Sequence, residues 1–336
     1  MKISLDGGAL CTPSDNQFGN YTFSKNLIEA LLLYDKKNIY NIYSYCNKPE
    51  YLKLKNNFAF KKILPKFGWS KVRVSIEELV NKKNIYLALN QSIPFATFSK
   101  VISFSHGLSF SFYPGLYHNF ARLNDQLEEM IDDSDKIVVS SLRVKNEMIE
   151  LDRNVEKKIC VIPFGIPLDM TPQKEVIKRE KFFLHVAMDH PIKNIEFTIK
   201  AYQSLVKQKN YRDYKLYLIG YQKKFKNPLI VAIPHVSRKA LKLLYQKTTA
   251  LLTSSFYESF NLPVLEALSQ RAPVIGLREA IVPELRPYVK LADDIGDFVS
   301  LMKKVIKNPK NQPIKKLARE FSWKNYITKL IKLYKV

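Results

Sequence analysis

The sequence has 336 residues and a mass of 39.1 kDa, above the size at which one hydrophobic core usually stops growing, so two domains are expected. Hydrophobic residues make up 46% and charged residues 25%, which excludes disordered and fibrous chains. No apolar run approaches the roughly 20 residues that span a bilayer, and we expect no secretory signal, because no charged segment followed by an apolar one opens the sequence. The cysteines, Cys11, Cys46 and Cys160, are far apart and odd in number, so we expect reduced core thiols in a cytoplasmic protein.

The formal net charge of +23 is the unusual global feature. Such a lysine excess has two explanations that the total does not separate. It reflects the base composition of the genome, or it serves anionic partners such as phosphorylated substrates, acidic lipid surfaces or nucleic acid. Residues 1–168 carry 22 basic and 17 acidic groups (+5), whereas residues 169–336 carry 32 and 14 (+18). A phosphate-bearing ligand is therefore expected in the second half.

Short strand-like runs alternate with helical stretches through the first half of the chain. The hydrophobic patterns predict strands at Lys2–Leu5, Ile39–Tyr45, Ile85–Leu89, Val101–Phe104, Ile137–Ser140 and Ile159–Ile162. They predict helices at Phe18–Tyr34, Leu116–Ile131 and Ser141–Leu151, the last opened by a serine cap. Alternation of this kind indicates a parallel sheet covered by helices on both faces.

The alternation restarts after a charged, proline-containing linker at about Pro167–Lys181. Strands are predicted at Phe182–Ala187, Tyr214–Ile219, Leu251–Ser254 and Pro273–Ile275, and helices at Asn194–Val206, Ser237–Gln246 and Leu262–Leu268. His185 lies within the first of these strands and is expected to be a core histidine. We therefore expect an α/β protein with two Rossmann-like, doubly wound domains, 1–166 and 167–321, which face a central cleft.

Two glutamates flank the start of the predicted helix at Leu262–Leu268. Glu258 precedes that helix, whereas Glu266 lies one turn inside it, and Pro263 fits the first turn. The amino end of a helix suits an anion such as phosphate, and the two carboxylates could accept hydrogen bonds from hydroxyls on either side of it. The alternative is that Glu258 is a surface loop residue and Glu266 only a partner of the helix dipole.

The segment from Glu258 to Ala267 resembles the double-glutamate signature of glycosyltransferase family 4, whose members are retaining enzymes of the GT-B fold. Further segments resemble the family in the same order along nearly the whole chain, at Gly19–Leu27, Ile102–Leu108, Phe112–Pro114, Ile137–Ser140, Val161–Gly165, His185–Asn194, Leu244–Tyr245 and Phe321–Trp323. The last of these implies a C-terminal helix, at about 322–336, that crosses back onto the first domain.

The resemblance implies a hexosyltransferase-like enzyme that takes a nucleotide-diphosphate sugar as donor and a glycan or lipid-linked molecule as acceptor. It implies no bound metal ion and no cofactor. The implied catalytic residues are Glu258, Lys193 and His106, and the implied donor-binding residues are Gly19, Asn20, Ser259, Phe260, Asn261, Leu262 and Glu266. Lys193 would neutralise the departing diphosphate, Glu258 would bind sugar hydroxyls and Glu266 the ribose hydroxyls, and no protein general base is required.

The sequence also departs from the family's pattern. The arginine that usually precedes the lysine is missing, because Met188 and Ile192 occupy the candidate positions. Arg271 and Arg278 are candidate substitutes. Less usual residues also stand at Gly107, where aspartate is common, and at Ser259 and Asn261, where glycine is common.

Basic and aromatic residues alternate along Phe58–Arg73. This segment could lie against an anionic membrane surface, which would make the protein peripheral on the inner face of the membrane, or it could be a basic rim around an ordinary hairpin or helix. The alternative function is a non-catalytic basic protein that binds nucleic acid or an anionic surface on a degenerate glycosyltransferase fold. Nucleic acid is not the expected partner, because arginine is scarce and no nucleic-acid-binding module is recognisable.

Overall fold

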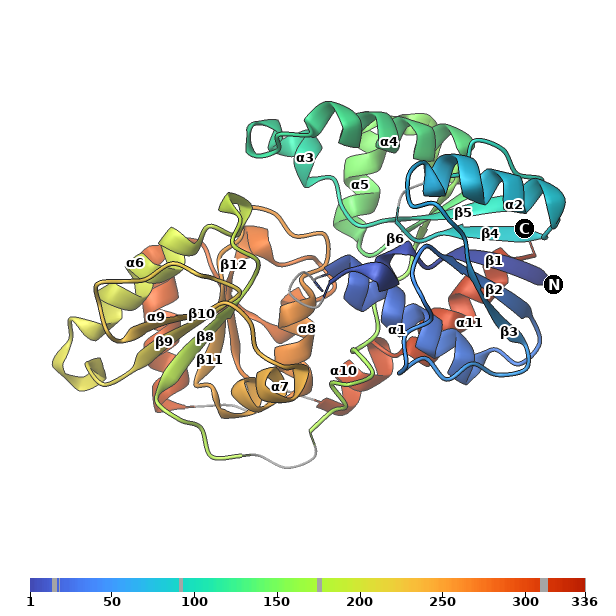
Figure 1. Cartoon of the computed structure of the whole chain (residues 1–336). Helices are drawn as coiled ribbons and strands as arrows, with labels where there is room; N and C mark the ends of the chain where they lie inside the picture. Colours follow the sequence, from blue (N-terminus) through green and yellow to red (C-terminus); the bar gives the residue numbers. More distant parts are fainter. Residues whose placement is uncertain (14–16, 18, 91–92, 174–176, 309–313, 336) are drawn as a thin grey trace. The chain divides into compact units, whose positions relative to one another are not determined.

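The computed structural model describes residues 1–13, 17, 19–90, 93–173, 177–308 and 314–335. The chain folds into two compact units (Figure 1). The first unit consists of Met1–Gly165 together with Trp323–Val336, and the second consists of Ile166–Ser322. The sequence places the domain boundaries at 166/167 and 321/322.

The first unit is built on a seven-stranded parallel sheet with the strand order β3-β2-β1-β4-β5-β6-β7. Its strands are β1 (Lys2–Asp6), β2 (Ile39–Ser44), β3 (Phe58–Lys62), β4 (Ile85–Ala88), β5 (Lys100–Ser105), β6 (Lys136–Val139) and β7 (Ile159–Val161). The main crossover helices are α1 (Gly19–Tyr34), α2 (Val74–Val80), α4 (Phe120–Asp133) and α5 (Leu142–Leu151). Figure 1 shows α4 and α5 on one side of the sheet and α1 on the other. All four residues of β4 are buried, as expected for a strand covered on both faces.

The last helix of the chain, α11 (Trp323–Leu333), packs against α1 of the first unit (Figure 1). The ring of Phe23 on α1 lies 6.3 Å from that of Trp323 and 6.2 Å from that of Tyr326. A Cβ atom on Gly165 would lie 2.7 Å from the Trp323 indole, so only glycine lets the backbone pass so close to the start of α11. The predicted return of the C-terminal helix to the first domain is therefore confirmed.

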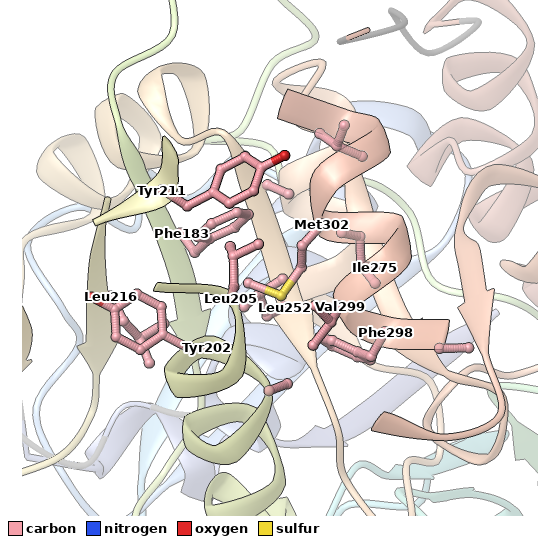
Figure 2. Close-up of a cluster of buried hydrophobic side chains, with 14 of the residues drawn as sticks. Phe183, Tyr202, Leu205, Tyr211, Leu216, Leu252, Ile275, Phe298, Val299 and Met302 are labelled. Atoms are coloured by element: carbon pink, nitrogen blue, oxygen red, sulfur yellow. The ribbon is translucent and has the colours of Figure 1, made fainter. Parts of the chain in front are cut away.

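The second unit contains a six-stranded parallel sheet with the order β10-β9-β8-β11-β12-β13. Its strands are β8 (Phe182–Val186), β9 (Lys215–Ile219), β10 (Ile230–Ile233), β11 (Ala250–Thr253), β12 (Val274–Leu277) and β13 (Lys290–Ala292). Its helices are α6 (Ile195–Val206), α7 (Arg238–Lys247), α8 (Leu262–Ser269), α9 (Ile295–Lys307) and α10 (Ile314–Glu320). Figure 2 shows the core on one face of this sheet, where Tyr202 and Leu205 of α6 and Phe298 and Met302 of α9 pack over Phe183 of β8. Both units thus have the predicted Rossmann-like architecture.

Some predicted element boundaries differ from the structure. Helix α4 begins at Phe120, not Leu116, because Pro114–Leu116 forms a short 3-10 turn and Tyr117 is extended. The segment Phe58–Arg73 is not a hairpin. Its first part, β3, pairs in parallel with β2, and its last part, η3 (Trp69–Arg73), is a π-helical turn that leads into α2.

The expectation of three reduced thiols is wrong, because Cys11 and Cys46 form a disulfide with their Cα atoms 5.6 Å apart. Cys11 ends the 3-10 turn η1 (Gly8–Cys11), which follows β1, and Cys46 follows β2. Since β1 and β2 are adjacent parallel strands, their carboxyl ends bring the two cysteines together despite a separation of 35 residues. Cys160 is a free, half-buried thiol. The argument from reduced thiols for a cytoplasmic location therefore does not hold.

The disulfide closes a long loop, so its loss should destabilise the first unit. We expect Cys11→Ser to lower the free energy of unfolding by about 2–4 kcal/mol, because the unfolded chain regains conformational entropy. Urea denaturation followed by circular dichroism, with and without dithiothreitol, measures this loss. The matched control is Cys160→Ser, which should keep the full sensitivity to reductant. Equal stability of the wild type with and without reductant would contradict the pairing.

Candidate functional site

Two loops of the second unit meet at one edge of its sheet. They follow β8 and β11, which are neighbouring parallel strands, so their carboxyl ends lie side by side. The backbone N–H of Phe256 donates to the carbonyl oxygen of Ile192 at 2.9 Å. The Ser254 hydroxyl donates to the carbonyl oxygen of Asn194 at 2.8 Å. These bonds fix the segment that carries Lys193 against the segment that carries Glu258.

Lys193 and Glu258 form an ion pair at this edge. Lys193 ends the 3-10 turn η6 (Pro191–Lys193), and its Nζ lies 2.8 Å from Oε1 of Glu258. The Ser255 hydroxyl donates to the same oxygen at 2.7 Å. The two side chains are only 18% and 13% exposed, so Glu258 is not a solvated loop residue. The predicted cation and the first predicted carboxylate are therefore in direct contact.

His185 lies close to this ion pair but inside the core. It is 2% exposed, and its ring nitrogens lie 3.4 Å from the Thr198 hydroxyl and 3.2 Å from the Tyr221 hydroxyl. Burial, and secondarily the charge of Lys193, lowers the pKa of His185 to about 4. The ring is therefore neutral at neutral pH, and His185 has the structural role that the sequence predicts.

The backbone turns sharply at Asn261, immediately before α8. Asn261 has φ +69°, and its Nδ2 lies 3.2 Å from the Thr253 hydroxyl and 3.4 Å from the carbonyl oxygen of Ala280. Asparagine adopts this left-handed conformation more readily than other residues that have a Cβ, which explains its presence where the family usually has glycine. Leu262 is the first residue of α8, and Pro263 follows it in the first turn, as predicted.

Ser259 and Phe260 connect Glu258 to this turn. Phe260 is 1% exposed, and its ring lies 6.0 Å from that of Phe321, so the loop is anchored in the core of the second unit. The implied donor-binding residues from Ser259 to Leu262 therefore form one rigid connection between Glu258 and the amino end of α8.

Glu266 lies in the second turn of α8 and is 3% exposed. Arg238 Nη2 donates to its Oε1 at 2.7 Å, and the Tyr245 hydroxyl donates to its Oε2 at 2.9 Å. Arg238 also donates to both carboxylate oxygens of Asp169, at 2.7 and 3.0 Å. Burial raises the pKa of Glu266, and Arg238 and Tyr245 oppose that rise. Glu266 is therefore more than a partner of the helix dipole.

Local patterns in the sequence do not predict Arg238 and Asp169 as site residues. Arg238 lies 28 residues before Glu266, and Asp169 lies a further 69 residues before Arg238, so no local spacing connects the three residues. The sequence does give the place of Arg238 on its helix. Ser237 caps α7 through a hydrogen bond from Ala240 N, so Arg238 is the first helical residue.

The two positions that could hold the family's phosphate-binding arginine are occupied by Met188 and Ile192. Ile192 is 4% exposed and packs in the core, whereas the Met188 side chain is 40% exposed. The proposed substitutes bind elsewhere. Arg278 pairs with both oxygens of Asp293, and Arg271 donates through Nε to the carbonyl oxygen of Gln173 at 2.9 Å. Lys193 is therefore the predicted cation that the structure brings to Glu258.

The remaining candidate residues belong to the first unit. Gly19 and Asn20 begin α1 and are exposed, and a Cβ atom on Gly19 would meet no atom within 4 Å. His106 follows β5, and its Nε2 donates to the carbonyl oxygen of Leu89 at 2.6 Å. Burial lowers the pKa of His106, so its ring is neutral at neutral pH and its Nδ1 is an acceptor. Gly107 has φ +117°, a conformation that disfavours the aspartate usual in the family.

Three comparisons with known proteins bear on this site. The O-antigen chain mannosyltransferase B of Escherichia coli is 27% identical over 288 residues, which cover 76% of this chain and 75% of that protein. The solved structure of sucrose-phosphate synthase from Thermosynechococcus elongatus superposes with a TM-score of 0.71 at 15% identity, over 99% of this chain and 98% of that one. HepE of Anabaena, solved in complex with UDP and glucose, has a TM-score of 0.71 at 12% identity, over 99% of each chain.

The two parallel sheets and these structural neighbours define the GT-B fold, as the sequence predicts. Residues 169–321 match the family described as glycosyl transferases group 1. This range covers nearly all of the second unit, which runs from Ile166 to Ser322. The second unit thus matches the group 1 glycosyltransferase family, in agreement with the resemblance carried by Glu258 and Glu266.

The left-handed backbone at Asn261 predicts the order of stability of two variants. Both Asn261→Gly and Asn261→Ala remove the hydrogen bonds of the side-chain amide, but only alanine carries a Cβ into positive φ. We expect Asn261→Ala to be less stable than Asn261→Gly by about 1–2 kcal/mol. Urea denaturation of the two proteins measures this difference. Equal stabilities would show that the backbone conformation at this turn does not limit the choice of residue.

The contact between Arg238 and Glu266 predicts a pH-dependent loss of stability. In Arg238→Met the buried carboxylate loses its charged partner, so we expect a loss of about 1–3 kcal/mol at neutral pH. The pKa of Glu266 is already raised in the folded protein, so protonation of the folded state on acidification relieves the cost of burial. The deficit relative to wild type should therefore shrink as the pH falls towards 4.5.

Urea denaturation at several pH values between 4.5 and 7.5 measures this deficit. The double variant Arg238→Met/Glu266→Gln is the control. It has no buried carboxylate at this position, so its deficit should be smaller at neutral pH and nearly independent of pH. A deficit of Arg238→Met that stays constant across this range would contradict the proposed role of Glu266.

Proposed function

We propose that this protein is a retaining, metal-independent glycosyltransferase that transfers a hexose from a nucleotide-diphosphate sugar to a glycan or lipid-linked acceptor. The observation that carries the proposal is the ion pair between Lys193 and Glu258, which lies beside the amino end of α8 at the carboxyl edge of a parallel sheet. Nucleotides bind at such edges in doubly wound sheets. The match of residues 169–321 to the group 1 glycosyltransferase family supports the same class of reaction.

The chemistry of the donor explains why a lysine and a helix end are needed. When the sugar leaves, the diphosphate gains negative charge and the anomeric carbon gains positive charge. Lys193 supplies a positive charge for the diphosphate, and the amino end of α8 adds the partial positive charge of the helix dipole. On donor binding the Lys193 ammonium would therefore exchange part of its contact with Glu258 for a phosphate oxygen.

The two glutamates take different parts of the donor in this proposal. Glu258 would accept hydrogen bonds from sugar hydroxyls, since its carboxylate is held in place by Lys193 and Ser255. Glu266 would accept hydrogen bonds from the ribose hydroxyls. Because Arg238 and Tyr245 bind one oxygen each, Glu266 is already oriented before a nucleotide arrives.

Retention of the anomeric configuration requires no protein base. The acceptor hydroxyl would attack from the face that the phosphate leaves, and the departing phosphate would take its proton. His106 fits a binding role in this scheme, since its neutral ring could accept a hydrogen bond from a sugar hydroxyl through Nδ1. Gly19 and Asn20, at the exposed start of α1, would approach the diphosphate.

The relatives support a hexose donor but do not select its nucleotide. One is a mannosyltransferase, and the Anabaena neighbour was solved with UDP-glucose as well as with UDP and glucose. The first experiment is therefore a thermal-shift screen of the wild type against UDP-, GDP- and ADP-sugars. A ligand present at 100 times its dissociation constant stabilises the folded state by about 2.7 kcal/mol.

Lys193→Ala and Glu258→Ala test the site with the donor that binds. We expect each to lower kcat of donor hydrolysis or transfer by about 100-fold or more, because each removes a preorganised charge beside the reacting bond. Matched controls are Lys200→Ala and Glu196→Ala, two exposed residues of α6, which should keep wild-type rates. Activity should survive EDTA, and proton NMR of the product should show the donor's anomeric configuration.

Full activity in Lys193→Ala and Glu258→Ala would overturn the assignment of the site. Inverted product would overturn the retaining mechanism, and loss of activity in EDTA that a divalent ion restores would overturn metal independence. If no nucleotide-sugar binds, and the protein instead binds DNA or RNA with a steep salt dependence, the non-catalytic alternative is correct.

A further inference from the structure

The first unit carries an exposed apolar surface that the proposed chemistry does not use. Within the described residues, no helix combines the length and apolar character needed to cross a membrane. The surface consists of eight large apolar side chains, each of them at least 40% exposed. They lie on η3, on α2, in the loop that precedes η3 and in the segment 93–98. These side chains are Leu64, Phe67, Val72, Ile76, Leu79, Val80, Phe95 and Phe98, which we call the apolar surface.

Half of the apolar surface is one face of a continuous helical segment formed by η3 and α2. Val72, Ile76, Leu79 and Val80 follow the i, i+4, i+7, i+8 spacing of one helix face, and they are 43%, 51%, 40% and 74% exposed. The opposite face, with Val74, Ser75 and Glu78, is buried. The helix therefore packs through its opposite face, and the face that carries most of its large apolar side chains is exposed.

The segment 93–98 lies along this helix and extends the apolar surface. The backbone N–H of Phe95 donates to the carbonyl oxygen of Lys71, and that of Ala96 donates to the Ser75 hydroxyl at 3.2 Å. Phe95 and Phe98 are held there with 72% and 63% of their area exposed. Phe67, in the loop before η3, is 92% exposed. All three of these aromatic side chains are therefore largely exposed.

Lysines surround the apolar surface. Residues 60–83 contain seven basic and two acidic residues. Of the two acids, Glu77 pairs with Lys61, and Glu78 is buried and accepts a hydrogen bond from Tyr43. Two lysines lie directly over exposed rings, Lys71 over Phe95 at 5.3 Å and Lys82 over Phe98 at 4.4 Å. Lys71 also pairs with Glu129, so the excess of positive charge around the apolar surface comes from the five basic residues other than Lys61 and Lys71.

We propose that the apolar surface docks onto an anionic lipid bilayer. Protruding phenylalanines beside lysine ammonium groups match the boundary of such a bilayer, where rings enter the acyl region and cations meet lipid phosphates. A folded protein partner would need a complementary groove for each protruding ring, whereas lipids rearrange around them. The proposal goes beyond the transfer reaction and depends on none of its residues, so either can fail without the other.

Vesicle flotation of the full chain tests the proposal without any sugar donor. We expect the wild type to float with vesicles that contain phosphatidylglycerol, to bind pure phosphatidylcholine at least tenfold more weakly, and to be released from the anionic vesicles by 0.5 M NaCl. The triple variant Phe67→Ser/Val80→Ser/Phe95→Ser should lose at least tenfold in apparent affinity. Its three positions are exposed, so circular dichroism should show a wild-type fold.

Two matched controls separate this surface from general stickiness. Leu142→Ser/Leu151→Ser removes two apolar side chains of the same unit that are 46% and 47% exposed, and it should bind like the wild type. Lys82→Gln/Lys83→Gln should weaken binding to anionic vesicles severalfold, whereas Lys223→Gln/Lys224→Gln, an exposed lysine pair in the second unit, should not.

Three results would overturn the proposal. The first is a wild type that does not float with anionic vesicles. The second is a triple variant that floats as well as the wild type. The third is a wild-type dimer in light scattering that the triple variant converts to a monomer, together with unchanged flotation, because the surface would then bind a second copy of the chain.

Discussion

The candidate site depends on a contact between one ammonium group and one carboxylate. Lys193 and Glu258 are 65 residues apart in sequence, yet their charged atoms lie 2.8 Å apart. They meet because β8 and β11 are adjacent and parallel, so the loops that follow both strands leave the sheet at the same edge. The hydrogen bond from the backbone N–H of Phe256 to the carbonyl oxygen of Ile192 then fixes the two loops against each other. A parallel sheet thus brings together two charges that local sequence cannot connect.

The second carboxylate, Glu266, lies in α8 and needs support of its own. Glu266 is buried in α8, and a buried carboxylate loses its hydration, which raises its pKa. Arg238 and Tyr245, both on α7, return part of this stabilisation, one contact to each carboxylate oxygen. The two glutamates therefore differ in kind, since Glu258 sits at the partly exposed edge and Glu266 is fixed inside. Such a division suits one group that meets a reacting sugar and one that anchors a nucleotide.

Local patterns in the sequence predicted the central elements of both units. Apolar runs marked β1 and β8, a serine cap marked α5, and Pro263 marked the first turn of α8. The edges of the sheets were harder, because β10 and β13 are only four and three residues long and are half-buried, although all four residues of β10 are apolar. The candidate residues Lys193, Glu258 and Glu266 were predicted from the resemblance to glycosyltransferase family 4, and the structure adds their contacts.

Other features were beyond local patterns for a topological reason. The disulfide depends on β1 and β2 being neighbours, a fact that the spacing of Cys11 and Cys46 does not contain. Arg238 likewise reaches Glu266 only because α7 and α8 pack together. Asn261 is a further example. The sequence shows it only as a departure from the glycine that is common in the family, whereas the structure shows a positive φ that asparagine tolerates.

Net charge and local charge point to different parts of the molecule. The second half of the chain carries most of the excess, +18 against +5, and the sequence therefore directs attention to the second unit, which we propose binds the donor. The lysines of residues 60–83 lie in the less basic half, but they surround exposed phenylalanines, and their acidic neighbours are paired or buried. A bilayer responds to the charge within about one Debye length, roughly 8–10 Å, and not to the sum over the chain. For lipid binding, the arrangement of a few exposed side chains thus outweighs the total charge.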